Sequence, residues 1–163
     1  MKLTDRRIVV TGCSGFIASH LVEKLIDLGN EVIGIDNFSA GRKEFMSHVE
    51  GNEKFTFVEG DLRTMDLNHL FQDVDVVCHM AANPDVRIGS ENTSVHFDQN
   101  IMVTYRILEA MKNCKVGCIL FPSTSAIYGE TTVVPTKEDY GPLIPISLYG
   151  ASKLSCEALI DSY

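Results

Sequence analysis

The sequence predicts an α/β fold in which helices cover both faces of a doubly wound parallel sheet. Short apolar runs rich in β-branched residues alternate along the chain with stretches whose apolar residues recur at helical spacing. The runs are apolar at consecutive positions, which is typical of strands buried on both faces. Because the crossovers between parallel strands are right-handed, we expect a three-layer αβα arrangement.

Five strands and the helices between them can be placed by residue range. Apolar runs predict strands at 7–12, 31–36, 54–61, 74–82 and 116–125. Helical spacing predicts helices at 15–28, 41–50, 66–72, 93–112 and from about 148 onward. The segment between the last strand and the last helix holds Pro135, Gly141, Pro142 and Pro145, and is expected to be a loop. We expect residues 1–163 to form one domain.

Composition narrows the class of partners. The chain has 163 residues, of which 45% are hydrophobic, with a formal net charge of −8. This charge disfavours nucleic acid and anionic membrane surfaces. No apolar run reaches the ~18 residues of a membrane span, and the N-terminus lacks the pattern of a signal peptide. The five cysteines match no zinc pattern, so we expect no metal. Their odd number and unremarkable spacing also give no sign of a disulfide framework, so we expect a cytoplasmic protein.

A glycine pattern marks the turn between the first strand and the first helix. Gly12, Gly15 and Ala18 form G-x-x-G-x-x-A within TGCSGFIA. Glycines permit the tight turn and the close approach of backbone N–H groups to a pyrophosphate, and the helix N-terminus adds its positive dipole end. Turn glycines also occur without a ligand, but the order strand, loop and helix favours a dinucleotide site.

An acidic residue ends the second predicted strand. Asp36 follows Gly15 by 21 positions, where a carboxylate would accept hydrogen bonds from ribose hydroxyls and repel a 2′-phosphate. Asp36 therefore favours NAD over NADP. Arg42 and Lys43 lie nearby and keep NADP open, and a solvated loop acid is the alternative interpretation of Asp36.

Near the end of the chain, Tyr149 and Lys153 lie one helical turn apart in SLYGASK and share a helix face. An ordinary tyrosine has a pKa near ~10, and a neighbouring ammonium group favours the phenolate that a general base requires. Thr124 is expected at the carboxyl end of the fifth strand, where open α/β sheets place ligands. The tyrosine–lysine spacing alone is common on amphipathic helices, so the prediction rests on its combination with the glycine loop.

These motifs together resemble the extended short-chain dehydrogenase/reductases, specifically the NAD-dependent sugar-nucleotide epimerase/dehydratase family with its Rossmann fold. The matching segments occur in family order along nearly the whole chain: TGCSGFIASH (11–20), IDNFSAG (35–41), GDL (60–62), HMAA (79–82), Asn100 with Thr104, STSAIYG (123–129) and YGASK (149–153).

The resemblance implies a role for individual residues. It assigns catalysis to Thr124, Tyr149 and Lys153, the last two of which also contact the cofactor. It implies that NAD is bound by residues of each motif: Gly12, Cys13, Gly15, Phe16 and Ile17 at the pyrophosphate, Asp36, Asn37, Ser39 and Gly41 at the adenosine ribose, Asp61 and Leu62 at the adenine, and Met80, Ala81, Ala82, Asn83 and Asn100 along the cofactor floor. For Asn100, an ordinary helix hydrogen bond is the alternative.

The residues after Thr124 indicate the reaction. Family 4,6-dehydratases resemble T-D-E-V-Y-G and decarboxylases resemble T-S-E-V-Y-G, whereas this chain reads T-S-A-I-Y-G. The pattern is similar to UDP-sugar 4-epimerases of the UDP-glucose/UDP-galactose type, which are isomerases of galactose metabolism. By resemblance, Tyr149 removes the proton of the sugar 4-hydroxyl while C4 passes a hydride to NAD. The 4-keto sugar then rotates and takes the hydride back on its other face.

The length of the chain sets a further expectation. Family members are roughly twice as long, and their C-terminal substrate domain, which binds the UDP-sugar, is absent from this sequence. We therefore expect the cofactor-binding half of an epimerase, inactive alone, with a homodimer through the helices at 93–112 and 148–163 as a plausible assembly. The alternatives are an NAD-binding module without catalysis and an NAD-dependent sugar-nucleotide reductase or dehydratase.

Overall fold

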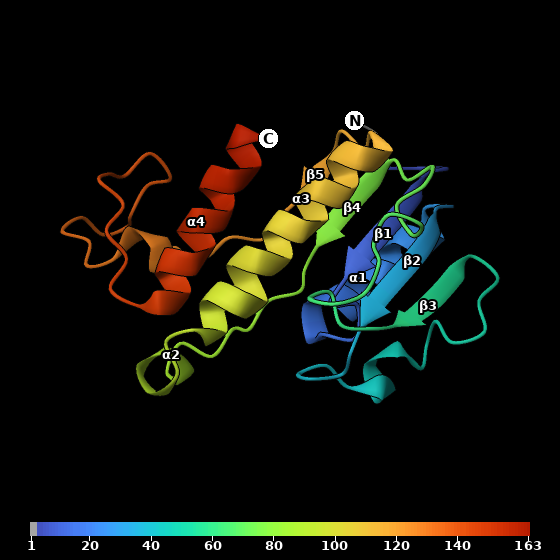
Figure 1. The fold of residues 1–163 in the computed structure, drawn as a ribbon, viewed down its shortest axis with the longest axis horizontal. Coiled ribbons are helices and arrows are strands. Elements are labelled where there is room, and N and C mark those ends of the chain that lie inside the picture. Colours follow the sequence, from blue (N-terminus) through green and yellow to red (C-terminus); the bar gives the residue numbers. More distant parts are fainter. Residues whose placement is uncertain (1–2) are drawn as a thin grey trace. The chain divides into compact units, whose positions relative to one another are not determined.

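The structure is a computed structural model that describes residues 3–163, and its chain forms two compact units. Unit 1 consists of Met1–Ala81 and Arg106–Pro122, and unit 2 consists of Ala82–Tyr105 and Ser123–Tyr163. Figure 1 labels the helices and strands of both units. Each unit is described by itself below.

Unit 1 contains a five-stranded parallel sheet. Its strands are β1 (Arg7–Thr11), β2 (Glu31–Asp36), β3 (Phe55–Glu59), β4 (Val76–His79) and β5 (Ile119–Leu120). Their order is β3-β2-β1-β4-β5, and every neighbouring pair is parallel. The chain winds from β1 toward one edge and then returns to build the other, so the topological switch point lies between β1 and β4. The predicted doubly wound α/β sheet of Rossmann type is confirmed.

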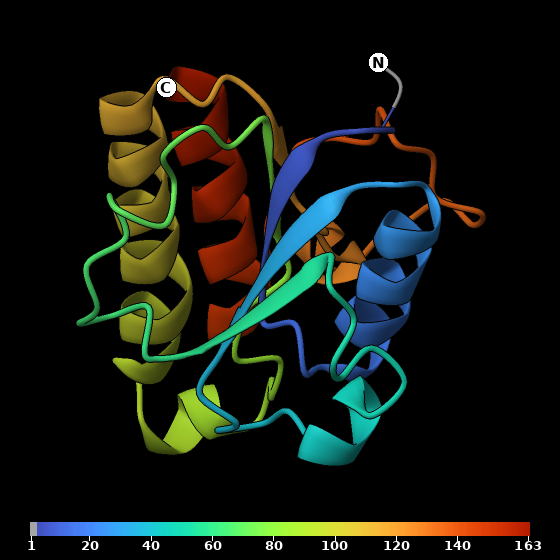
Figure 2. The ribbon, with the colours of Figure 1, turned by 90° about the vertical axis from the view of Figure 1, so that its right-hand side faces the viewer.

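Helices cover both faces of this sheet (Figure 2). Helix α1 (Phe16–Asp27) lies against one face, and the Arg106–Cys114 part of helix α3 (Met102–Cys114) lies against the other. Successive strand residues point to opposite faces, which is why β1 is apolar at consecutive positions. Ile8 and Val10 join the core beneath α1, and Val9 between them is equally buried.

Unit 2 is built around helices. It contains α2 (Ile88–Glu91), the π-helical turn η2 (Phe97–Ile101), the first turn of α3, the 3₁₀ turn η3 (Ser125–Tyr128) and α4 (Leu148–Ser162). The predicted last helix is confirmed, and the helix predicted at 93–112 is helical from residue 95, passes through the π turn η2 and continues to Cys114. Among residues 3–163, no helix is long and apolar enough to cross a membrane.

Two predicted helices of unit 1 are wrong. Residues 66–72 form turns because Asp66 Oδ1 accepts a hydrogen bond from the backbone N–H of Asn68 (3.0 Å), which competes with helix formation. The helix predicted at 41–50 is reduced to the four-residue 3₁₀ turn η1 (Lys43–Met46).

The fifth strand is much shorter than predicted. The N–H of Val116 still bonds to the carbonyl of Met111 at the end of α3 (2.8 Å), and Pro122 has no N–H for a sheet hydrogen bond. Only Ile119 and Leu120 therefore form β5, instead of residues 116–125. As a result, Thr124 is not at a strand end but lies in unit 2.

The core predicts a stability effect at Phe71, which is fully buried in unit 1. We expect Phe71→Ala to lower the free energy of unfolding by ~3–5 kcal/mol, because it removes a large apolar side chain and leaves a cavity. Urea unfolding measures the change. Phe97→Ala is the control, since this residue is 53% exposed and the loss of its ring should cost less than ~1 kcal/mol. Equal effects of the two substitutions would contradict the assigned core.

Candidate active site

The loop between β1 and α1 in unit 1 is shaped for a close backbone approach. Gly12 has φ +66°, and a Cβ there would lie 2.7 Å from Cα of Ala81. The N–H of Gly12 bonds to the carbonyl of Ile35 (2.7 Å), and the N–H of Gly15 bonds to the carbonyl of Gly12 (3.0 Å). These contacts fix the loop as a tight turn that only glycine fits.

Helix α1 begins at this loop without a side-chain cap among the described residues. The backbone N–H groups of its first turn therefore point out of the helix end as donors, together with the positive end of the helix dipole. The side chains of Phe16 and Ile17 in this turn are 66% and 70% exposed. Uncapped donors flanked by exposed apolar side chains fit a dinucleotide pyrophosphate.

Cys13 contributes to the loop only through its backbone. Its side chain is completely buried, and its Sγ lies against Gly34. Burial, with a smaller contribution from the Asp36 carboxylate, raises the pKa of the Cys13 thiol to about 12. The thiol is therefore a packing group beneath the loop.

The carboxylate of Asp36 is held at the carboxyl end of β2. Its Oδ2 accepts from the N–H of Ser14 (3.0 Å) and its Oδ1 from the N–H of Phe38 (2.7 Å). The side chain is nearly buried, and two carboxylate oxygens can together accept about four hydrogen bonds. Asp36 is thus oriented by the backbone and retains acceptor capacity for a ribose diol.

The segment after β2 folds back over the glycine loop. Asn37 Oδ1 accepts from the N–H of Ser39 (3.0 Å), and the N–H of Arg42 bonds to the carbonyl of Ser14 (3.0 Å). A Cβ on Gly41 would collide with Ser14 Oγ, so Gly41 allows this close packing. Within residues 3–163, Ser14 Oγ is buried and has no hydrogen bond partner.

The ends of β1 and β4 are joined by polar contacts that sequence reasoning missed. The hydroxyl of Thr11 accepts from the N–H of Ala81 (3.2 Å) and shares a second hydrogen bond with Nδ1 of His79 (2.8 Å). Thr11 and His79 are register partners in the sheet, and both are buried. Met80 packs against the core beside them. These contacts fix the path of the predicted cofactor-floor residues Met80 and Ala81.

The two residues predicted at the adenine, Asp61 and Leu62, lie in the turn that follows β3. Arg63 donates to the Asp61 carboxylate and thereby lowers the pKa of Asp61. The carbonyl of Leu62 accepts from Nε of Arg106 (2.9 Å), which was not singled out from the sequence.

In unit 2, Asn100 is the centre of a buried polar network. Its Oδ1 accepts from the N–H of Asn83 (2.7 Å), and its Nδ2 donates to Ser152 Oγ (3.0 Å). Ser152 Oγ in turn donates to the carbonyl of Tyr149 (2.7 Å). The ring of His96, also buried, lies 5.7 Å from the ring of Tyr149, centroid to centroid. Within unit 2, Asn100 thus links Asn83, which is predicted at the cofactor floor, to α4, the helix that carries Tyr149.

Ala82, another predicted cofactor-floor residue, is the first residue of unit 2 and is half-buried.

The structure brings the elements of Thr124 and Tyr149 into direct contact within unit 2. Thr124 Oγ1 caps η3 by accepting from the N–H of Ala126 (3.2 Å), and Ser147 Oγ caps α4 by accepting from the N–H of Gly150 (3.0 Å). A Cβ on Gly150 would lie 2.5 Å from the carbonyl oxygen of Ala126. Gly150 therefore lets α4 approach η3 beside Tyr149.

Lys153 follows Tyr149 by one turn of α4 and is only 3% exposed. Burial lowers the pKa of its ammonium group, against the opposing effect of Cys156 and Glu157. A lysine charge held in a desolvated place interacts strongly with a neighbouring phenolate, which is the role predicted for it beside Tyr149.

The buried lysine predicts a pH-dependent stability difference between the unaltered chain and Lys153→Met. The folded-state pKa lies below the unfolded value of 10.5, so the charge destabilises the fold below the folded pKa. That cost disappears as pH rises toward 10.5. We expect Lys153→Met to be the more stable protein at pH 7, with the difference shrinking toward pH 10. Urea unfolding at both pH values measures it, and a variant less stable at pH 7 would contradict the argument.

Comparison with known proteins places this chain among sequence relatives along almost its whole length. It is 41% identical to the putative UDP-glucose 4-epimerase of Methanocaldococcus jannaschii, covering 96% of this chain and 50% of that protein. It is 34% identical to the UDP-glucose 4-epimerase of Mycolicibacterium smegmatis, covering 96% of this chain and 51% of that protein. The chain thus spans about half the length of the curated relatives it matches.

Solved structures show the same fold. The UDP-N-acetylglucosamine 4-epimerase from Methanobrevibacter ruminantium M1, in complex with UDP-N-acetylmuramic acid, superposes with a TM-score of 0.92 at 37% identity over 98% of this chain and 50% of that chain. The UDP-glucuronic acid 4-epimerase from Bacillus cereus, in complex with UDP-glucuronic acid and NAD, gives a TM-score of 0.87 at 39% identity over 96% of this chain and 52% of that chain.

The profile of the NAD dependent epimerase/dehydratase family matches residues 8–163. This match includes the glycine loop, Asp36 and the helix of Tyr149 and Lys153. The chain therefore belongs to the NAD dependent epimerase/dehydratase family.

Proposed function

We propose that this chain is the cofactor-binding half of an enzyme that catalyses NAD-dependent 4-epimerisation of a UDP-hexose, of the UDP-glucose/UDP-galactose type, and that it carries the acid/base residues of that reaction. The observation that carries the proposal is the contact between η3 and α4, which places Thr124 and Tyr149 on adjoining elements, with the desolvated Lys153 one turn further along. A protein that only binds NAD would need none of the three. The similarity to UDP-sugar 4-epimerases supports the same reaction.

The described residues also fit NAD. The uncapped first turn of α1 offers backbone donors to the pyrophosphate, and Asp36 offers its oriented carboxylate to the adenosine ribose. Asp61 and Leu62 follow β3 and would contact the adenine. When bound, NAD supplies the hydride acceptor for oxidation at C4 and the hydride donor for the reverse step.

The acid/base residues perform the proton steps. Thr124 orients the 4-hydroxyl of the sugar, and Tyr149 accepts its proton as C4 is oxidised. The ammonium of Lys153 stabilises the phenolate of Tyr149, because burial excludes the water that would screen their attraction. Tyr149 then returns the proton to the 4-oxygen once the hydride has been delivered to the opposite face.

The residues after Thr124 favour epimerisation over elimination or decarboxylation. Ser125 and Ala126 carry no carboxyl group, and the N–H of Ala126 is occupied by Thr124 Oγ1. The chain therefore has no acidic residue at the two positions where the dehydratase pattern T-D-E-V-Y-G has Asp and Glu. Without an acid at these positions, neither elimination nor decarboxylation is assisted, and the oxidised sugar takes the hydride back.

Cofactor binding is the first test of the proposal. We expect the chain to bind NAD⁺ saturably in a calorimetric titration and NADP⁺ at least ~10-fold more weakly, because Asp36 repels a 2′-phosphate. Asp36→Ala should weaken NAD⁺ binding ~10-fold or more, since two charge-assisted hydrogen bonds are lost. Asp75→Ala, at the other end of the sheet strands, is the control and should bind NAD⁺ normally. Equal affinity for both dinucleotides would refute the role of Asp36.

The acid/base assignment predicts the effect of Tyr149→Phe. In a form of the protein that interconverts UDP-glucose and UDP-galactose, kcat should fall ~10²–10⁴-fold, because the phenol that accepts the proton is gone. NAD⁺ affinity should change much less. Tyr105→Phe, on an exposed part of α3, is the control and should leave kcat unchanged. A Tyr149→Phe variant with normal turnover would eliminate Tyr149 as the base.

A further inference from the structure

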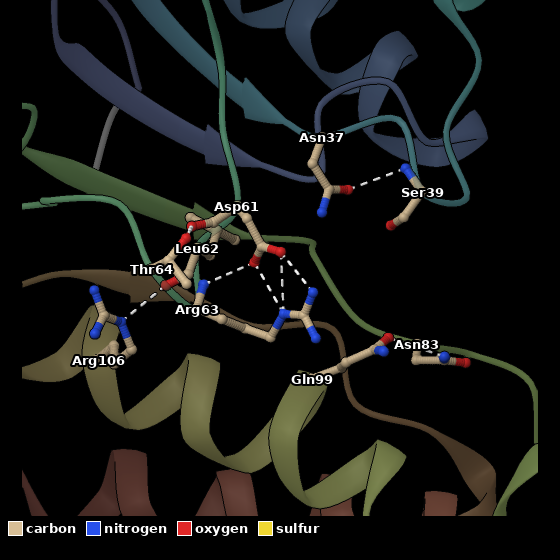
Figure 3. A network of polar contacts seen from close by, with 9 residues as sticks. All are labelled: Asn37, Ser39, Asp61, Leu62, Arg63, Thr64, Asn83, Gln99 and Arg106. Carbon is tan, nitrogen blue, oxygen red and sulfur yellow. Dashed lines mark hydrogen bonds and ion pairs between the residues drawn. The ribbon is translucent and has the colours of Figure 1, made fainter. Parts of the chain in front are cut away.

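The turn that follows β3 is a single compact loop of residues 61–65 in unit 1 (Figure 3). The carbonyl of Asp61 accepts from the N–H of Thr64 (3.0 Å) and from the N–H of Met65 (2.9 Å). This leaves the next carbonyls of the turn, including those of Leu62 and Met65, to find partners elsewhere.

Arg106 of α3 provides those partners. Its Nε donates to the carbonyl of Leu62 (2.9 Å), and its Nη2 donates to the carbonyl of Met65 (2.7 Å). Figure 3 shows the guanidinium directed at this turn. A planar guanidinium suits two acceptors at once, and hydrogen bonds from a cation are stronger than neutral ones. Arg106 therefore ties the main chain of the turn to a helix far away in sequence.

The side chain of Asp61 is held from the opposite side. Its Oδ1 accepts from the N–H of Arg63 (2.9 Å) and from Arg63 Nε (3.0 Å), and its Oδ2 accepts from Arg63 Nη2 (2.6 Å). The side chain of Asn37 makes a further, smaller contribution that lowers the pKa of this carboxyl group. Because Arg63 belongs to the same turn, it orients the Asp61 carboxylate relative to the turn but does not anchor the turn itself. The position of the carboxylate therefore depends on what holds the turn in place.

We propose that Arg106 is a positioning residue that sets the adenine selectivity of the cofactor site, acting through the 61–65 turn. The inference rests on the proposed function, in which Asp61 meets the adenine of NAD. Arg106 does not contact the cofactor in this account. It keeps the Asp61 carboxylate in the place and direction in which it can recognise the base.

The chemistry of the base explains why selectivity, and not affinity alone, depends on Arg106. Adenine carries a 6-amino group, which donates hydrogen bonds to a carboxylate. Hypoxanthine carries a 6-oxo group, whose lone pairs the carboxylate repels. A rigidly held carboxylate therefore strengthens the binding of adenine and weakens the binding of hypoxanthine, because an unpaired or repelled polar group is costly when buried. A mobile carboxylate can turn away from either base and does not discriminate between them.

The experiment titrates the chain with NAD⁺ and with nicotinamide hypoxanthine dinucleotide by calorimetry. We expect the unaltered chain to prefer NAD⁺ by ~10-fold or more. Arg106→Met should weaken NAD⁺ binding ~10-fold and leave the hypoxanthine dinucleotide within about 3-fold, so that the preference is lost. Arg106→Lys keeps a cation that can reach one carbonyl, so its preference should be intermediate; it also serves as the test variant if Arg106→Met does not fold.

Asn113→Ala is the matched control, because Asn113 also lies on α3 and donates to a turn residue, Asn68 Oδ1 (3.2 Å), outside 61–65. It should retain the full preference for NAD⁺. Equal weakening of both dinucleotides by the Arg106 substitutions, or an unchanged preference, would overturn the inference while the proposed cofactor site stands. A failure of the unaltered chain to bind NAD⁺ would instead reject the proposed function and the inference with it.

Discussion

The close approach of the two chain segments that leave β1 and β4 is the constraint on which the rest of unit 1 depends. Gly12 passes so near Ala81 that no side chain fits between them, and Thr11 bonds to both His79 and Ala81 at the same point. The sheet reverses its winding direction there, so the chain leaves the two strands on diverging paths. The uncapped start of α1 is placed at this divergence, which is where open α/β sheets bind ligands.

Unit 2 depends on a second glycine contact of the same kind. Gly150 allows the backbone of α4 to touch the carbonyl of Ala126, and the buried Asn100 and Ser152 tie the start of that helix to the π turn. The elements that carry the acid/base residues are thereby packed at backbone distance. Burying the charged Lys153 in the same helix costs free energy, and a fold selected for stability alone would place an apolar residue there.

The parts of the fold that could be predicted are those governed by local sequence. Strands β1 and β2 were predicted because their residues are β-branched and buried on both faces, and α4 was predicted from the helical spacing that follows a loop rich in proline and glycine. The turns at 66–72 were missed because an Asx hydrogen bond at Asp66 outweighed an apolar pattern. The strand before Thr124 was overestimated, because Val116 remains bonded to the end of α3.

The candidate site shows the same division. The glycine loop, Asp36 and the Tyr149–Lys153 pair could be predicted because their spacing in sequence reflects one turn or one strand–helix unit. The contacts of Thr11 with His79, and of Arg106 with Leu62, join residues 68 and 44 positions apart. Neither pair has a local pattern, so only the tertiary structure identifies them.

The burial of Cys13 has a consequence for the chemistry of the glycine loop. Burial raises the pKa of this thiol to about 12, so at pH 7 the side chain is in its neutral form. Peroxide and electrophiles react with the thiolate, so the buried sulfur of Cys13 is protected from both by its protonation as well as by its lack of access. The loop can thus carry a cysteine through oxidative stress without losing its shape.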